Sequence, residues 1–108
     1  MAYLKALQCL SDPTRRRVFE RLRSGPKSVG TLARGLPVTR PAVSQHLRAL
    51  KEAGLVDERR NGTRRLYRAR PEGLVDLKTF LEAFWDDRLA ALKREAELEQ
   101  RSMHGKHD

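Results

Sequence analysis

The sequence predicts a mainly α-helical fold with one small β-hairpin, and three observations support this prediction. Apolar residues recur at steps of three and four through residues 3–53 and again after residue 72, which is the pattern of helices with one buried face. From Leu55 the period changes to two, and Asn61 and Gly62 interrupt it as a hairpin turn would. Proline and glycine stand where the predicted helices begin and end.

Two helices are expected at the start of the chain. The first covers residues 3–10. Asp12 is then a candidate N-cap for the second, with Pro13 at the first helical position, where a missing N–H costs nothing. This second helix runs to about residue 23 and should bury Val18, Phe19 and Leu22. Its arginines at 15–17 are expected to face solvent, with a phosphate contact as the alternative.

A tight pair of helices follows. Ser28 is placed to cap a short helix over residues 28–34, and the glycine and proline of residues 35–39 break it. Thr39 is then the N-cap of a longer helix, which has a proline in its first turn and Gly54 as its C-cap. Two helices joined by so short a turn form a helix-turn-helix.

Residues 57–70 are expected to form a two-stranded ribbon. The dipeptide Asn61-Gly62 is the strongest short-range hairpin signal, because both residues of such a turn must accept positive φ. The ribbon has a net charge of +4 and carries six arginines, Arg59, Arg60, Arg64, Arg65, Arg68 and Arg70.

A long final helix is predicted from about residue 72 to residue 100, with one apolar stripe that is rich in leucine and aromatic residues. Residues 101–108 are expected to be a disordered tail. A chain of 108 residues rarely holds two hydrophobic cores, so residues 1–100 are expected to form a single domain that includes this helix.

The charge of the chain favours a polyanionic partner. The formal net charge is +9, and residues 1–70 carry 17 basic and 5 acidic side chains, whereas residues 71–108 carry 6 and 9. The basic surface therefore belongs to the first two thirds of the chain and suits nucleic acid. No apolar run approaches the roughly 18 residues that a membrane span needs, so we expect a cytoplasmic protein that associates with the nucleoid.

The helix over residues 40–53 has one face that packs and one that projects. Val43, Leu47 and Leu50 lie within about 60° of one another on a helical wheel, and Gln45 and Arg48 lie roughly opposite. Glutamine can pair with adenine and arginine with guanine in the major groove, while serine and threonine serve bases or phosphates. The candidate base-reading residues are Thr39, Arg40, Ser44, Gln45 and Arg48.

The helix-turn-helix and the arginine-rich ribbon together predict a winged helix-turn-helix that binds double-stranded DNA. The helix over residues 40–53 is then the recognition helix, which enters the major groove, and the ribbon over residues 57–70 is the wing. A solvated helix face with the same residue types is the alternative. His46 lies at the edge of the packing face, and it either donates to a phosphate or is hydrogen-bonded internally. The candidate phosphate and wing contacts are His46, Arg59, Arg60, Arg64, Arg65 and Arg68.

The final helix has more apolar surface than a small winged helix can cover. Aromatic patches of this kind are typical of obligate interfaces, so we predict a homodimer that forms through this helix and binds a palindromic operator. The alternative is that these side chains cover the core of the monomer. The candidate interface residues on this helix are Leu77, Phe80, Leu81, Phe84, Trp85 and Leu89.

At this point a family resemblance becomes clear. The segments LKALQCLSDPTRRRVFERL, VGTLARGLPVTRPAVSQHLRALKEAGLV and RRNGTRRLYRA resemble the ArsR family of bacterial winged-helix repressors, over nearly residues 3–92. The resemblance implies a homodimer with the first and last helices at its interface, which adds Leu4 and Leu7 to the candidate interface residues. It also implies a repressor that occupies an operator near its own promoter.

No metal site is predicted. ArsR members that sense metals use a cysteine pair in the helix before the recognition helix, or Asp and His ligands on the last helix. Here the segment SVGTLARGL has neither Cys nor His, and the acidic residues of the last helix have no histidine before His104. The chain therefore resembles the branch of the family without the metal motif, and no cofactor is expected.

The sequence leaves open one alternative to DNA binding and one addition to it. One is a winged-helix module whose basic face meets an acidic protein; the other is a repressor gated by a small ligand or by oxidation of Cys9, the single cysteine. We expect Cys9 to be a small buried hydrophobic residue. Catalysis is not expected, because Ser44 and His46 point to different faces of one helix. The operator, the regulated genes and the inducing signal are not predicted.

Overall fold

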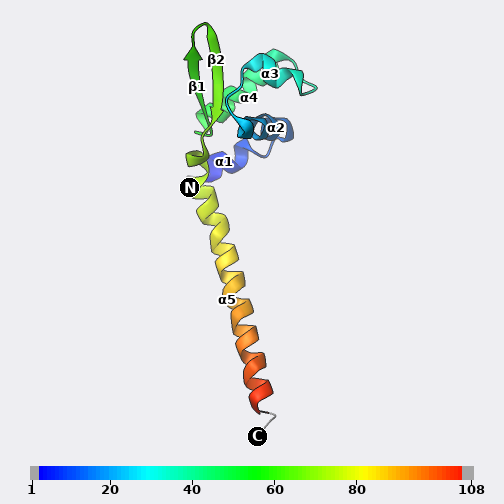
Figure 1. The fold of residues 1–108 in the computed structure, drawn as a ribbon, viewed down its shortest axis with the longest axis vertical. Coiled ribbons are helices and arrows are strands. Elements are labelled where there is room, and N and C mark those ends of the chain that lie inside the picture. The colour runs from blue at the N-terminus through cyan, green and yellow to red at the C-terminus, as the bar shows by residue number, and fades with distance from the viewer. Residues whose placement is uncertain (1–2, 106–108) are drawn as a thin grey trace. The chain divides into compact units, whose positions relative to one another are not determined.

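The fold is a set of short helices followed by a hairpin and one long helix (Figure 1). It is known from a computed structural model that describes residues 3–105, with side chains described for residues 3–102. The elements in chain order are α1 (Tyr3–Cys9), α2 (Pro13–Arg21), η1 (Leu22–Ser24), α3 (Val29–Arg34), α4 (Arg40–Glu52), β1 (Val56–Asn61), β2 (Arg64–Ala69), η2 (Pro71–Leu74) and α5 (Val75–Gly105).

The chain divides into two units, the first ending at Leu77 and the second starting at Lys78. This division lies inside α5. Leu77 is the last residue that packs against the core of the first unit. The single domain predicted for residues 1–100 therefore corresponds to the first unit together with part of the second.

The predicted helix starts at Asp12, Ser28 and Thr39 are confirmed. Each residue has an extended backbone, and its side-chain oxygen accepts a hydrogen bond from the amide three residues later, at 2.9, 3.2 and 3.3 Å respectively. These bonds satisfy amides that the first turn of a helix leaves without partners. The three caps fix where α2, α3 and α4 begin.

The end of α4 is a Schellman motif built on Gly54. The amide of Gly54 donates to the Lys51 carbonyl at 3.0 Å, and the amide of Leu55 donates to the Leu50 carbonyl at 2.9 Å. Gly54 has a φ of 77°, in the left-handed region that favours glycine. The chain turns here directly from the recognition helix into β1.

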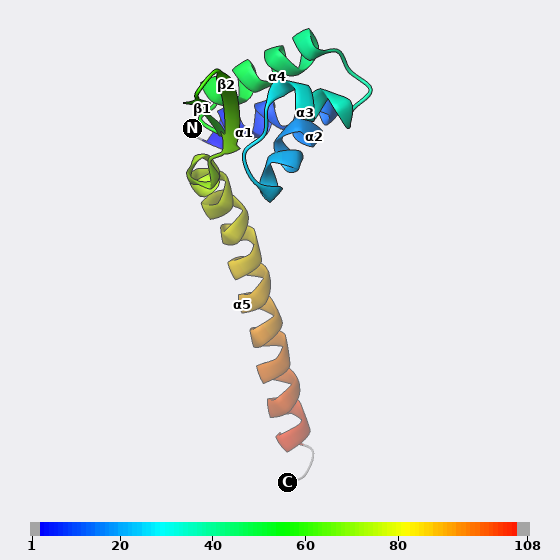
Figure 2. The same ribbon diagram turned by 45° about the horizontal axis from the view of Figure 1, so that its top comes forward.

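The core of the first unit lies where α2 and α3 pack on α4 (Figure 2). The packing face predicted for α4 is confirmed, because Val43, Leu47 and Leu50 are fully buried. Val18 and Leu22 are buried as predicted, and Phe19 packs against the core while only partly buried. Burial of one such side chain contributes about 1.5–3 kcal/mol, so this cluster holds α4 against α2 and α3.

The hairpin forms as predicted, but its turn is one residue later than the sequence suggested. Asn61 pairs with Arg64, so the two loop residues are Gly62 and Thr63 and not Asn61 and Gly62. Only Gly62 has a positive φ, of 67°, which is the pattern of a type II′ turn and not of a type I′ turn. Both types suit the twist of a hairpin, so the Asn-Gly pair predicted the hairpin correctly and its register incorrectly.

The last helix starts and ends later than predicted. Residues 71–74 form the short helix η2, and α5 then continues from Val75 to Gly105. Residues 101–105 were predicted to belong to a disordered tail, but they are helical. The reason is that the helix continues from a segment rich in the strong helix formers Ala, Leu, Glu, Lys and Arg. The rest of that predicted tail, residues 106–108, lies outside the described residues. Within residues 3–105 no helix is both long and apolar enough to cross a membrane.

Candidate nucleic-acid interface

The exposed face of α4 contains two polar side chains that have no protein partner. Ser44 and Gln45 are exposed, and neither makes a side-chain hydrogen bond within the part of the chain that the structure describes. They lie on the side of the helix away from the buried leucines. Their donors and acceptors are therefore free for an external ligand.

Arg48 lies on the same exposed side but has a neighbour that the sequence analysis overlooked. Its Nε lies 3.5 Å from the Glu52 carboxylate one turn later, and the two side chains are 83% and 72% exposed. An exposed pair of this kind contributes little to stability. Arg48 can thus leave Glu52 for a base or a phosphate at small cost.

The start of α4 is more constrained than the sequence suggested. The Thr39 oxygen already accepts the capping hydrogen bond from the Ala42 amide, which leaves its hydroxyl hydrogen free to donate. The Arg40 side chain folds back over α3, where a Cβ built on Gly30 would lie 3.1 Å from Nη2 of Arg40. Arg40 therefore packs against the first turn of α3 while remaining exposed to solvent.

The wing arginines fall into two groups. Arg65, Arg68 and Arg70 pair with carboxylates of β1, at 3.4 Å from Glu58 and at 3.0 and 3.5 Å from Asp57. The remaining arginines of the hairpin are exposed and have no hydrogen bond or ion pair within residues 3–105; they are Arg59, Arg60 and Arg64. This second group is the one available to phosphates.

Glu58 joins the wing to the recognition helix. One oxygen of its carboxylate lies 3.2 Å from Lys51 Nζ in the last turn of α4, and the other lies 3.4 Å from Arg65 Nε on β2. The Glu58 side chain is only 22% exposed. Because both partners of this carboxylate are basic, it holds two cations of the predicted DNA-facing surface in place. Sequence alone predicts no role for Glu58, because the hairpin register and the packing of β1 on α4 determine which cations it contacts.

His46 differs from the other predicted contacts. Its Nδ1 is buried and has no hydrogen-bond partner within the described residues. The amide hydrogen bond from Arg15 is the largest cause of a lowered pKa of Asp12, the N-cap of α2, and the proximity of His46 contributes to the same shift. Nδ1 therefore faces the protein, and only the Nε2 edge of the ring remains for the predicted phosphate contact.

Comparison with known proteins shows which family this chain belongs to. Residues 10–59 match a helix-turn-helix domain family. The chain is 58% identical over 81 residues to the HTH-type transcriptional regulator Rv2034 of Mycobacterium tuberculosis. The aligned residues cover 75% of this chain and 76% of that protein. The solved ArsR-like transcriptional regulator from Rhodococcus sp. RHA1 matches with a TM-score of 0.71 and 38% identity, over 86% of this chain and 91% of that one. This chain belongs to the ArsR family of winged-helix transcriptional regulators.

A further solved structure is that of a homodimer. It is the winged helix-turn-helix DNA-binding domain of Mb0332 from Mycobacterium bovis, a possible ArsR-family transcriptional regulator. It matches this chain with a TM-score of 0.63 and 28% identity, over 82% of each chain. These comparisons confirm the fold class and the family predicted from the sequence.

The predicted interface residues of this ArsR-family chain are not all equally free. On α1, Leu4 and Leu7 are 42% and 47% exposed. Leu77 is partly buried against the core of the first unit, and Phe80 is partly buried and makes an edge-to-face contact with Phe84 at 5.2 Å between ring centroids. Among the predicted interface residues of α5, those at least half exposed are Leu81, Phe84, Trp85 and Leu89. Two apolar residues of α5 outside the predicted set, Val75 and Leu98, are also exposed, at 55% and 63%.

The single thiol of this ArsR-family chain is buried. Cys9 is 6% exposed, and burial raises the pKa of its thiol, although the nearby Arg15 charge partly offsets this. This placement confirms the prediction that Cys9 is a buried hydrophobic residue. Among residues 3–102, no three His, Cys, Asp or Glu side chains lie close enough together to hold a metal ion. His104, named in the sequence analysis, lies outside the residues whose side chains are described.

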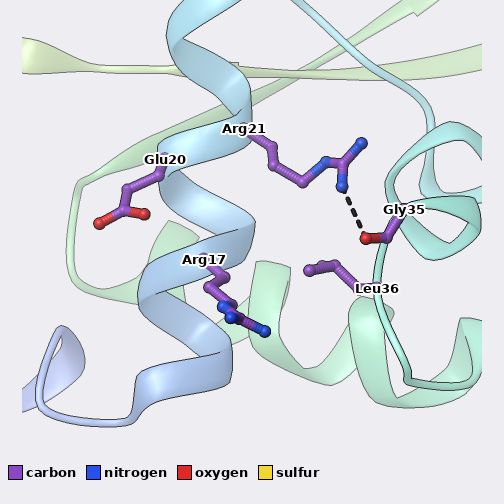
Figure 3. A pocket seen from close by; sticks show the side chains of 5 residues that line it. All are labelled: Arg17, Glu20, Arg21, Gly35 and Leu36. Atoms are coloured by element: carbon purple, nitrogen blue, oxygen red, sulfur yellow. Dashed lines mark hydrogen bonds between the residues drawn. The ribbon is translucent and has the colours of Figure 1, made fainter.

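The hollows on the first unit include two beside the helix-turn-helix and the base of the hairpin. One, of about 520 Å³, is lined mostly by apolar side chains of η1, β2 and η2, including Leu22, Ala69 and Leu74. The other, of about 370 Å³, lies between α2 and the turn of the helix-turn-helix (Figure 3). The first hollow has a size suited to a small ligand, so the small-ligand alternative has a physical location in this fold.

Proposed function

We propose that this chain is a dimeric repressor that binds a palindromic operator in double-stranded DNA, with α4 in the major groove and the β1–β2 wing on the flanking backbone. The observation that carries the proposal is that two features occur together in the first unit. Ser44 and Gln45 form an exposed polar face without side-chain hydrogen bonds, and the wing has exposed arginines without a carboxylate partner within residues 3–105. The polar face suits base edges, and the free arginines suit phosphates. Such a protein acts at DNA in the cytoplasm and carries out no catalysis.

The dimer is part of this proposal. Three exposed apolar side chains within one turn and a half of α5, Leu81, Phe84 and Trp85, would be costly to leave in water. A second copy of α5 would cover them with an identical surface, as a two-fold interface requires. Two recognition helices related by such an axis would read half-sites about one helical turn of DNA apart, or a multiple of it.

A test of base reading compares Gln45→Ala with Gln8→Ala, a matched change on α1. DNA retained by the protein from genomic fragments first supplies the operator. We expect Gln45→Ala to weaken operator binding by about 1–3 kcal/mol more than it weakens binding to random DNA, and Gln8→Ala to alter neither. Equal losses on both DNAs for Gln45→Ala would remove this residue from base reading.

A test of the dimer replaces Trp85 with glutamate and measures mass by sedimentation at micromolar concentration. A charge placed in an apolar interface is costly, so we expect the variant to be monomeric and to bind the operator weakly. Lys93→Glu, an equally exposed change of charge on the same helix, should leave the dimer intact. A wild-type chain that sediments as a monomer would contradict the proposed dimer.

The gating alternatives differ in what supports them. The buried thiol of Cys9 and its raised pKa argue against a switch based on oxidation, because the thiolate is the reactive form. The apolar hollow bounded by η1, β2 and η2 supports a small-ligand switch, although nothing on its walls selects one inducer. We retain from the sequence the proposal that the chain senses no metal. An operator-binding titration that is unchanged by added zinc would support this.

A further inference from the structure

The turn between α3 and α4 is tied to α2 by one arginine. Arg21 is the last residue of α2, and its Nη1 donates a hydrogen bond of 2.8 Å to the carbonyl oxygen of Gly35, the C-cap of α3. Figure 3 shows the Arg21 side chain reaching from α2 across the hollow to this carbonyl. A cation at the C-terminal end of a helix also meets the negative end of the helix dipole. Arg21 therefore contacts the helix-turn-helix at the exposed residue Gly35, where the turn begins.

Gly35 is shaped to receive this side chain. A Cβ built on Gly35 would collide with Nη1, Nη2 and Cζ of Arg21. The φ of Gly35 is −95°, which any residue can adopt, so glycine is not needed here for its backbone freedom. The space beside its Cα is needed because the guanidinium group occupies it.

Leu36 and Val38 of the turn pack against the hydrophobic core, but the turn has few other hydrogen bonds. Its own hydrogen bonds are local, from the Leu36 amide to the Ala33 carbonyl at 3.3 Å and from the Val38 amide to the Leu36 carbonyl at 2.8 Å. Pro37 has no N–H to donate. Within residues 3–105, the bond from Arg21 is the hydrogen bond that reaches residues 35–38 from another helix. The helix α3 has only 6 residues and is held to the core by the buried Leu32, so the Arg21 bond adds a polar contact at its C-terminal end.

We infer that Arg21 is a positioning residue for the recognition helix. It fixes the turn at Gly35, and through the turn it fixes the N-terminal end of α4, where Thr39 and Ser44 face outward. This inference rests on the proposed DNA-binding function. Base contacts depend on small displacements of the side chains that make them, whereas binding to random DNA depends mainly on the number of charges near phosphates. Loss of the tie should therefore reduce discrimination between sequences more than it reduces general affinity.

Gly35→Ala is the sharpest test, because it displaces the guanidinium group without changing the charge or straining the backbone. We expect it to weaken operator binding about tenfold, which corresponds to the loss of one charged hydrogen bond, and to leave binding to random DNA unchanged. Arg17→Ala is the matched control. Arg17 lines the same hollow one turn earlier on α2 and makes no hydrogen bond or ion pair within residues 3–105. Its removal should affect both DNAs equally or neither.

A double variant separates positioning from simple damage. In an Arg21→Ala background the added methyl of Gly35→Ala meets no guanidinium group, so the second change should cause no further loss of discrimination. Additive losses would overturn the inference, and so would a Gly35→Ala protein that keeps the wild-type ratio of operator to random affinity. Circular dichroism establishes that each variant is folded before it is titrated.

Hydrogen exchange reads the same contact without DNA. We expect Gly35→Ala to accelerate exchange of the amides at residues 36 and 38 and in the first turns of α4, and to leave the amide of the buried Leu47 protected. Unchanged exchange at 36 and 38 would overturn the inference. If the wild-type chain showed no preference for any DNA, the proposed function would fail, while the exchange result would still decide whether Arg21 holds the turn.

Discussion

Lys51 Nζ, in the last turn of α4, lies 3.2 Å from Oε2 of Glu58 on β1, and the second oxygen of Glu58 lies 3.4 Å from Arg65. We predict that Glu58→Gln releases both cations while keeping the size of the side chain. Binding to random DNA should then strengthen, with a salt dependence steeper by about 1–2 in log–log slope. Discrimination between operator and random DNA should fall, because the wing is no longer tied to α4.

The matched control for this prediction is Glu52→Gln, which frees Arg48 but does not touch the wing. It should strengthen general binding without lowering discrimination, because the wing stays tied to α4 and the freed Arg48 is itself a candidate base-reading residue. Titrations over a series of salt concentrations measure both quantities. An unchanged slope for Glu58→Gln would mean that the two cations do not face DNA.

The two groups of wing arginines should behave differently. Arg64 has no partner within residues 3–105, whereas Arg68 is paired with Asp57 at 3.0 Å. We predict that Arg64→Ala weakens binding to all DNA nearly uniformly and makes the salt slope shallower by about 1. Arg68→Ala should change the slope less and act mainly on the hairpin. Equal slope changes in the two variants would show that pairing with Asp57 does not withhold Arg68 from phosphates.

The left-handed conformation of Gly54 predicts a stability effect. A Cβ at this position would meet nothing within 4 Å, so the effect of a substitution comes from the backbone alone. We expect Gly54→Ala to lower the free energy of unfolding by about 1 kcal/mol, and Gly54→Asn to lower it less, because asparagine tolerates this conformation better. Urea unfolding with an unchanged m-value measures this. Equal stability of the alanine variant and the wild type would contradict the Schellman geometry.

The N-cap of α2 predicts a pH dependence. The amide hydrogen bond from Arg15 lowers the pKa of Asp12 below its ordinary value of 3.8 in the folded chain. A carboxylate with a depressed folded pKa stabilises the fold above its ordinary pKa, and this contribution disappears as pH falls through the folded pKa. Asparagine is also a good N-cap, so Asp12→Asn isolates the charge. We expect the wild type to be the more stable protein near pH 7 and the difference in unfolding temperature to shrink as the pH falls below the ordinary pKa and through the lowered folded pKa of Asp12. A difference that stays constant with pH would contradict the shift.

The burial of Cys9 predicts slow thiol chemistry. Because burial raises the pKa of this thiol, little thiolate forms near neutral pH, and reagents reach the sulfur poorly. We expect a chromogenic disulfide reagent to react far more slowly with the folded chain than with the same chain in denaturant. Fast modification of the folded protein, with loss of operator binding, would contradict this prediction and support a switch based on oxidation of Cys9.

Local features of the fold were predictable from the sequence, because their causes are local. The caps at Asp12, Ser28 and Thr39 depend on a side chain and on an amide three residues away, and all three are present in the structure. The packing face of α4 follows from helical spacing alone and is confirmed as well. The hairpin register did not follow in this way, because Asn-Gly suits two turn types that differ by one residue in register.

The partners of the charged residues could not be read from the sequence. Arg40 packs over Gly30, and Arg68 pairs with Asp57 across the hairpin, through contacts that only the register and the helix packing create. The tie from Arg21 to Gly35 joins positions 14 apart in the chain, and no periodic pattern marks it. Composition predicted a basic DNA-facing surface, but only the structure divides its cations into those that are paired and those that are free.

The most direct test of the central claim is one titration of the wild-type chain, at one stated salt concentration, with its selected palindromic fragment and with the same fragment scrambled. We predict that two chains bind each palindrome and that the palindrome is preferred by about a thousandfold or more, as for sequence-specific regulators. Equal affinity for both fragments, or one chain per palindrome, would contradict the claim.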